Sequence, residues 1–189
     1  MMQYTNDIIV ARPNYCVPAV LEMVLNHHNI SSFSQDDIAQ QLNIVPTDDS
    51  VDPELWGAHI SDDTLNHFFA QNGIPLRERY ISIHNFMDEY FMGEKIATLL
   101  VNDVSIICGY NYTWLFGKKE DRFGHVSIIV SISDNLEKVE LLDPGPKNAG
   151  YKTVGSYDLY AAIKARNDGL WCIQPVSTSD NIQGERKYK

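Results

Sequence analysis

The spacing of apolar residues changes along this chain, and that change constrains the fold more than any other feature. Between Tyr15 and Asn26 the apolar residues recur at intervals of three and four, which is typical of a helix with a buried face. From about residue 96 onward, short runs rich in Val, Ile and Leu are typical of strands. Helices followed by strands predict an α+β fold, in which a helical lobe packs on an antiparallel sheet.

The chain is long enough for one domain with a sizeable core, since it has 189 residues, of which 44% are hydrophobic. We expect this domain to span residues 1–176, with a helical lobe over about 12–93 and a sheet lobe over about 94–176. A flexible polar tail is expected over 177–189. Helices are expected from residue 16 to about 28 and over 34–42, 62–71, 83–92 and 156–166, and strands over 7–11, 96–101, 104–109, 125–132, 139–142 and 170–174.

A cysteine, a histidine and an aspartate stand at the ends of three of these elements. Cys16 lies in the first turn of its helix, His125 opens a strand and Asp143 closes the next strand. The partial positive charge of a helix N-terminus and a nearby imidazolium both favour the thiolate, which is the nucleophilic form of cysteine. A hairpin would place Asp143 beside His125, where the carboxylate can orient the imidazole. We therefore interpret Cys16, His125 and Asp143 as candidate nucleophile, base and orienting acid.

The other two cysteines lie within predicted strands and not at the start of a helix. Cys108 and Cys172 lie within apolar, strand-like runs, so both are expected to pack in the core. A buried, inert thiol is also the alternative for Cys16 taken alone. The position of Cys16 at the start of a helix, together with the downstream His and Asp, favours the catalytic interpretation.

Composition excludes several other classes of function. A net charge of −10 argues against nucleic acid as a partner, because phosphate binding needs clustered Lys and Arg. No basic segment followed by an apolar run opens the chain, and no apolar stretch approaches the roughly 20 residues of a membrane helix. We therefore expect no membrane partner, a cytoplasmic location and free thiols. Neither four zinc ligands at sensible spacing nor a phosphate-binding glycine pattern is present, so no metal and no cofactor are expected.

Three segments resemble the papain-like cysteine peptidases of the bacteriocin-processing, double-glycine-leader family and its peptidase-like relatives. They are Tyr-Cys-Val-Pro-Ala at 15–19 with Met-Val-Leu-Asn-His-His-Asn at 23–29, Gly-His at the start of a strand, and Leu-Asp-Pro at 142–144. The corresponding family helix begins Asp-Cys-Gly-Pro-Ala and continues Met-Val-Leu-Asn-Tyr-Tyr-Gly. The resemblance implies a papain-like fold and a thiol-dependent hydrolase acting on a peptide or protein substrate. It also implies Cys16 as nucleophile, His125 as base and Asp143 as orienting residue.

The sequence departs from the family pattern near the candidate nucleophile. Val17 replaces the usual Gly, and Val10 stands where the family usually has a Gln that donates to the oxyanion. Such a donor is worth roughly 3–4 kcal/mol of barrier in other enzymes. Asn14 is the nearest amide and is the candidate replacement, beside the backbone N–H of Cys16. The alternative for Asn14 is a cap on the following helix, a common role for asparagine.

Two other functions remain compatible with the sequence. An acyltransferase would form the same thioester and pass the acyl group to an amine instead of water, and the triad alone does not distinguish the two acceptors. A binding module could retain the fold after losing activity, which the missing Gln favours and the intact Cys, His and Asp set opposes. The sequence carries no indication of the oligomeric state.

Overall fold

The computed structural model describes residues 4, 8–44, 58, 60, 63–117, 124–145 and 147–176. Its helices are α1 (Cys16–His27), α2 (Gln35–Gln41), α3 (Thr64–Gln71), the 3-10 turn η2 (Ile83–Asn85), α4 (Glu89–Val101), α5 (Tyr112–Phe116) and α6 (Ser156–Arg166). Its strands are β1 (Leu76–Ser82), β2 (Ser105–Asn111), β3 (Gly124–Ile132), β4 (Lys138–Asp143), β5 (Gly150–Gly155) and β6 (Gly169–Pro175). The tail expected over 177–189 lies outside the described residues.

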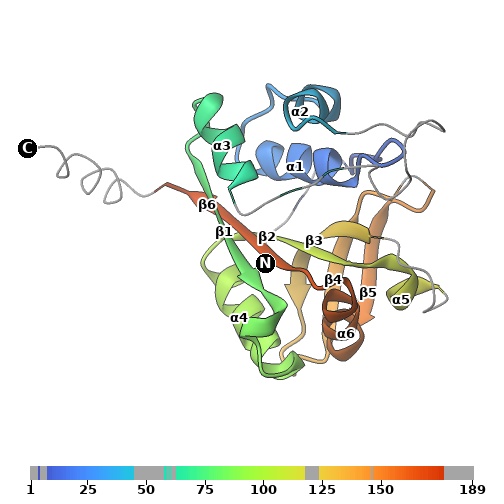
Figure 1. The fold of residues 1–189 in the computed structure, drawn as a ribbon. Coiled ribbons are helices and arrows are strands. Elements are labelled where there is room, and N and C mark those ends of the chain that lie inside the picture. The colour runs from blue at the N-terminus through green and yellow to red at the C-terminus, as the bar shows by residue number, and fades with distance from the viewer. Residues whose placement is uncertain are drawn as a thin grey trace, which may run out of the picture.

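The strands form one six-stranded sheet in the order β1-β6-β2-β3-β4-β5, and every neighbouring pair is antiparallel. Helices α1, α2 and α3 lie on one side of this sheet, and α4 and α6 lie on the other (Figure 1). The α+β architecture with an antiparallel sheet, expected from the order of helical and strand-like segments, is therefore confirmed.

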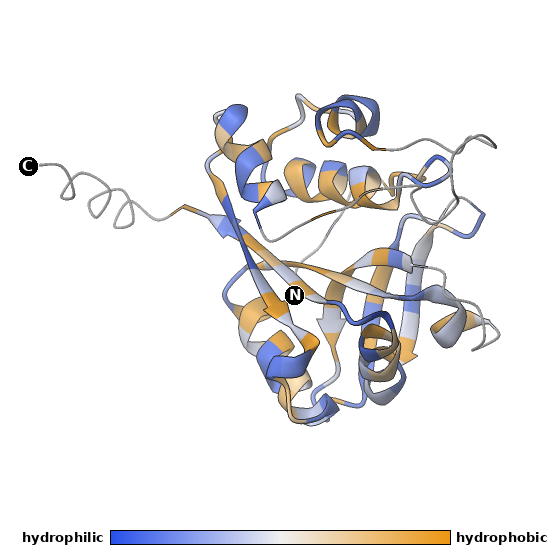
Figure 2. Cartoon of the chain, in the orientation of Figure 1, coloured by the Kyte–Doolittle hydropathy of each residue, from blue (hydrophilic) through white to orange (hydrophobic). Residues whose placement is uncertain are grey.

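The core between α1 and the sheet explains why α1 is apolar around most of its circumference. Residues from Val17 to Leu25 are buried at all but one position, because α1 packs on β3 below and on α2 above. Figure 2 shows α1 as a mostly hydrophobic helix between the more polar α2 and the sheet. The sheet contributes Ile107, Val126 and Ile128 to the same apolar cluster. Burial of apolar surface stabilises the folded state by roughly 25 cal/mol per Å², so this packing holds α1 in place on β3.

A second core fills the opposite face of the sheet. Ile106, Cys108 and Ile129 alternate with the residues of the first core, as expected for strands buried on both faces. Helices α4 and α6 cover this side. Cys108 and Cys172 are 0% and 4% exposed, which confirms that both pack in the core.

The region around α4 differs from the sequence-based expectation. The expected helix over 83–92 is a 3-10 turn followed by the start of α4, and the expected strand over 96–101 is the second half of that helix. Asp88 begins α4 by accepting hydrogen bonds from the N–H groups of Tyr90 and Phe91. Gly93, the residue after the helix expected over 83–92, lies inside α4, where a Cβ would approach side-chain atoms of Ile132 and Leu136 to 3.3 Å. Its small size therefore serves close packing of the helix on the β3–β4 hairpin.

The first residues also differ from expectation. Of the strand expected over 7–11, residues 8–11 are described and carry no strand. They lie beside the end of β4 all the same, because the N–H of Ala11 donates to the carbonyl of Pro144 at 2.7 Å. This contact brings the segment that leads into α1 next to the residues that follow Asp143.

The remaining expectations agree with the structure to within a few residues. Ser34 caps helix α2: its side chain accepts from the N–H of Asp37, while the Asp37 carboxylate accepts from the N–H of Ser34. Helix α6 has the expected bounds. Three of the described elements were not expected from the sequence: the two edge strands β1 and β5, and the short helix α5.

Candidate active site

Cys16 is the first residue of α1, and a tight turn presents it there. The N–H of Tyr15 donates to the carbonyl of Arg12 at 2.9 Å, with Pro13 and Asn14 at the centre of the turn. Asn14 has a φ of 64°, in the left-handed region that asparagine tolerates better than most residues. Proline followed by a left-handed residue is the signature of a type II turn. The turn ends at Tyr15. Cys16 follows it at the beginning of the helix, where it is half-buried.

His125 is the second residue of β3 and is 8% exposed. Its Nε2 lies 2.7 Å from Oδ1 of Asp143, and the Cys16 thiol lies close enough to the imidazole to raise its pKa. Since Nε2 is used by the carboxylate, Nδ1 is the nitrogen that faces the sulfur. The rings of Tyr110 and Tyr112 stand edge-on to the imidazole, with centroids 5.7 and 5.2 Å away. The imidazole is therefore held on several sides.

Asp143 is the last residue of β4 and is completely buried. Its Oδ1 accepts from His125 and from the N–H of Gly145 at 2.8 Å, and its Oδ2 pairs with the ammonium of Lys152. Burial alone would raise the pKa of this carboxyl. The hydrogen bonds from His125, Lys152 and Gly145 outweigh burial and hold its pKa below the ordinary value. Asp143 is thus a buried carboxylate with each oxygen occupied.

The same contacts set the charge of His125. Burial tends to lower the pKa of the imidazole, but its hydrogen bonds and charge interactions with Asp143 and Cys16 prevail and raise the pKa to about 9. His125 therefore carries its proton at neutral pH. An imidazolium between a sulfur and a carboxylate can stabilise a thiolate and later return a proton to a leaving group.

The structure brings together the three residues that the sequence pattern singled out. Cys16 comes from the helical side of the fold, His125 and Asp143 come from neighbouring strands, and the contacts run from thiol to imidazole to carboxylate. No distant chain segment has to move to join them.

Lys152 is the member of this cluster that sequence reasoning missed. It lies on β5, diagonally across the sheet from Asp143, because Lys152 pairs with Leu141 and Asp143 pairs with Gly150. Residues 151 and 153 of β5 are exposed, so this edge strand lacks the apolar run that identifies a buried strand. Without a recognised β5, nothing in the sequence placed Lys152 near Asp143.

The position of the usual oxyanion Gln is occupied by a residue that faces solvent. Val10 is 52% exposed, and its carbonyl accepts a hydrogen bond from Nε2 of Gln35 at 3.2 Å. The N-cap of α1 is Tyr15, not Asn14, and it provides no side-chain cap to the helix. The alternative interpretation of Asn14 as the N-cap is therefore wrong. Asn14 lies in the turn that leads to Cys16.

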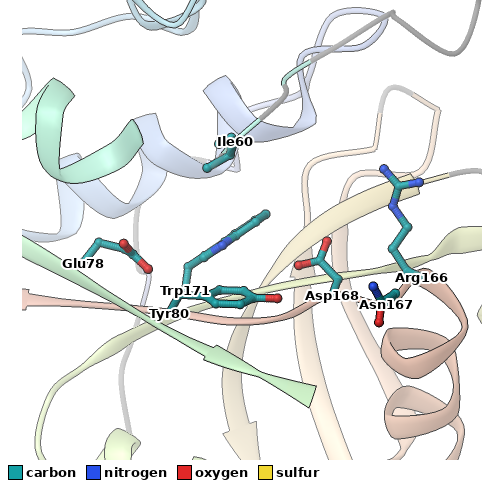
Figure 3. Close-up of a pocket in the computed structure, with 7 residues that line it drawn as sticks. All are labelled: Ile60, Glu78, Tyr80, Arg166, Asn167, Asp168 and Trp171. Carbon is teal, nitrogen blue, oxygen red and sulfur yellow. The ribbon is translucent and has the colours of Figure 1, made fainter. Parts of the chain in front are cut away.

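A cavity of about 270 Å³ is lined by Ile60, by residues of β1 and β6, and by the end of α6 with the two residues that follow it. Figure 3 shows the indole of Trp171 standing between Glu78 and Asp168, with Tyr80 beside it and Arg166 at one side. The guanidinium of Arg166 lies against the backbone of Gly124, where a Cβ would approach Cζ to 2.7 Å. Gly124 immediately precedes His125, so the wall of the cavity adjoins the strand end that carries the imidazole.

Comparisons with known proteins identify the family of this chain. Residues 1–166 match the Peptidase_C39 like family. The chain belongs to this family. The fold is similar to the crystal structure of a Bacillus anthracis protein named for its likeness to C39 peptidases, with a TM-score of 0.66 and 13% identity. That similarity covers 94% of this chain and 98% of the other. No curated protein matches the sequence.

Membership of the Peptidase_C39 like family supports a peptidase-type function of the cysteine peptidase kind. The resemblance noted from the cysteine helix, Gly-His and Leu-Asp-Pro segments is thus confirmed. Among the described residues, no helix is long and apolar enough to cross a membrane. In the same part of the chain, no group of three or more His, Cys, Asp or Glu side chains is arranged to hold a metal ion.

Proposed function

We propose that this chain is a thiol-dependent peptidase with Cys16 as nucleophile, His125 as general acid and base, and Asp143 as orienting residue. The observation that carries the proposal is the line of contacts from the Cys16 thiol through His125 to the buried carboxylate of Asp143. Each member has the environment its role needs: a helix start for the nucleophile, two hydrogen-bond partners for the imidazole and full burial for the acid.

The reaction begins with attack of the Cys16 thiolate on the carbonyl carbon of a peptide bond. When the tetrahedral intermediate collapses, the C–N bond breaks and the His125 imidazolium gives its proton to the leaving amine. The acyl group remains on sulfur as a thioester. The imidazole, now neutral, takes a proton from water as the water attacks the thioester, and the acid product leaves. Asp143 keeps Nε2 protonated throughout, so Nδ1 is the nitrogen that exchanges protons.

The oxyanion of the intermediate needs donors at the start of α1. The N–H of Cys16 belongs to the first turn of a helix whose N-cap side chain does not cap it. We assign this N–H and the Asn14 amide as the donors that replace the family's Gln. The left-handed backbone of Asn14 brings it within two residues of the nucleophile, on the turn that α1 continues.

The substrate is a peptide or protein segment bound in the cavity beside Gly124. Tyr80 and Trp171 offer aromatic surface, with ring centroids 6.4 Å apart, while Arg166 and Asp168 offer charged groups. In binding pockets, a small number of precisely placed polar groups usually fix the orientation of the ligand and provide specificity. A substrate chain lying there would pass close to the strand end that carries His125.

The test is digestion of a complex peptide mixture in water enriched in oxygen-18, with and without a primary amine. We expect new peptide ends carrying one heavy oxygen, and no such ends with Cys16→Ala. Acyl groups found on the added amine in place of heavy oxygen would indicate an acyltransferase. Peptides bound by the folded protein but left intact would indicate a binding module and would contradict the proposal.

A further inference from the structure

We propose that Lys152 is a positioning residue of this site, which holds the Asp143 carboxylate in the orientation that His125 requires. The inference rests on the proposed function and adds to it a fourth residue, from a strand that none of the other three occupies.

The division of contacts on Asp143 supports this role. Oδ1 accepts from Nε2 of His125 at 2.7 Å and from the N–H of Gly145 at 2.8 Å, whereas Oδ2 is bound by the Lys152 ammonium. A carboxylate held at only one oxygen can rotate away from the imidazole. Because Lys152 holds the other oxygen, Oδ1 remains directed at His125. The Lys152 side chain is only 19% exposed, so solvent screens this pair less than a surface ion pair.

Lys152 also contacts two aromatic rings of helix α5, one of which packs against His125. Its Nζ lies 4.9 Å from the ring centroid of Phe116 and 5.5 Å from that of Tyr112. Tyr112 in turn stands edge-on to the imidazole, at 5.2 Å between centroids and 81° between planes. Such cation–π contacts gain strength when partly desolvated. Lys152 therefore holds both the carboxylate behind the imidazole and helix α5, which supplies an aromatic ring beside it.

We expect the charge of Lys152 to influence the protonation of His125 as well, through Asp143. Among the described residues, the charged and titratable groups beside the imidazole or its carboxylate partner are Cys16 on α1, Tyr110 on β2, Tyr112 on α5, Asp143 on β4 and Lys152 on β5. Lys152 is the cation among these neighbours, and it offsets part of the negative charge of Asp143. Removing it leaves that charge unopposed, so the imidazolium is held more tightly and loses its proton at higher pH.

The experiment measures the rate of Cys16 alkylation by iodoacetamide against pH, which requires no knowledge of the substrate. The high-pH step of this profile reports loss of the His125 proton, since a thiolate no longer paired with imidazolium reacts faster. In Lys152→Met we expect that step to move upward by about half a pH unit or more. In Lys152→Arg we expect it to stay in place, because the charge is retained.

Two further variants separate charge from packing. Lys152→Gln can still donate a hydrogen bond to Asp143 but has no charge, so it should show the same upward movement even if Lys152→Met does not fold. Lys164→Met removes a lysine that lies over Tyr160 at 5.6 Å on α6 and serves as the matched control. On a cleaved peptide, Lys152→Met should lower kcat up to about 100-fold with little change in KM, as expected for misplacement of a catalytic group.

The outcomes distinguish the two proposals. Profiles for Lys152→Met and Lys152→Gln that coincide with the wild type would overturn the role of Lys152, as would an equal shift in Lys164→Met. Absence of the high-pH step in the wild-type protein would instead show that Cys16 and His125 form no ion pair, and would count against the proposed function itself.

Discussion

Nε2 of His125 lies 2.7 Å from Oδ1 of Asp143, across the hairpin formed by β3 and β4. This bond uses Nε2 and leaves Nδ1 for the thiol of Cys16. It therefore fixes both the tautomer and the direction of the ring. The three-residue arrangement depends on this relationship, because the cysteine and the histidine approach each other from different layers of the fold.

Cys16 is expected to be the dominant site of alkylation by iodoacetamide at neutral pH. It is half-buried beside the His125 imidazolium, whereas burial raises the pKa of Cys172 to about 12 and raises that of Cys108 still further. Peptide mapping by mass spectrometry after brief treatment measures all three sites together. Faster modification of Cys108 or Cys172 in the folded protein would contradict the assignment of Cys16 as the nucleophile.

Replacing Asp143 by Asn is expected to lower peptide turnover by about 10,000-fold, because the amide no longer enforces the productive tautomer of His125. The matched control is Glu140→Gln, which removes a carboxylate from the same strand; Glu140 pairs with Ser131 rather than with His125. Turnover per folded molecule should change little in that control. Comparable activity in the two variants would exclude Asp143 as the orienting residue.

The stability of the protein is expected to fall at alkaline pH. The pKa of His125 is raised from 6.5 to about 9 by Asp143 and Cys16 against the opposing effect of burial, so the protonated imidazole stabilises the folded state. That contribution is complete below pH 6.5 and disappears as pH rises through about 9. Urea midpoints measured across this range should decline in the wild type and decline less in His125→Gln. An equal decline in both would place the titrating group elsewhere.

A substitution that tests the role of Asn14 must be compatible with its left-handed backbone conformation. Alanine at a φ of 64° should cost about 1–2 kcal/mol through strain, which confuses any effect on catalysis. Glycine accepts this conformation and removes the amide. If Asn14 donates to the oxyanion, Asn14→Gly should lose about 100-fold or more in turnover while its unfolding midpoint stays close to the wild type. Undiminished turnover in Asn14→Gly would show that Asn14 does not donate to the oxyanion and serves only to form the turn.

The sequence predicted the helix start, the two strand ends and the residues at each, because all three lie in elements with strong apolar patterns. Val20, Leu21 and Val24 identify α1, and the Ile128–Ile129 region identifies β3. Adjacent antiparallel strands joined by a short hairpin then leave few positions for Asp143 relative to His125. The lateral order of the sheet, with β6 inserted between β1 and β2, has no comparable local signal.

Elements at the margins of the fold were missed for the same physical reason. The edge strand β1 alternates buried Leu76 and Glu78 with exposed Arg77 and Arg79, and β5 is largely polar. Charged residues on edge strands prevent pairing with other chains but conceal the strands from apolar patterning. The expected helix stopped just before Gly93, but this glycine lies within α4, where close packing requires a residue without a side chain. Lys152 was missed because its role depends on β5.

Labelling with a peptide chloromethyl ketone tests the central claim most directly, because it requires a reactive Cys16 and a cleft that accepts a peptide. We expect one adduct on Cys16 in the wild-type protein, formed at least about 100-fold more slowly in His125→Gln, since loss of the base removes the activation of the thiol. An adduct on another residue, or equal labelling rates with and without His125, would contradict the assignment of Cys16 and His125 as the catalytic pair.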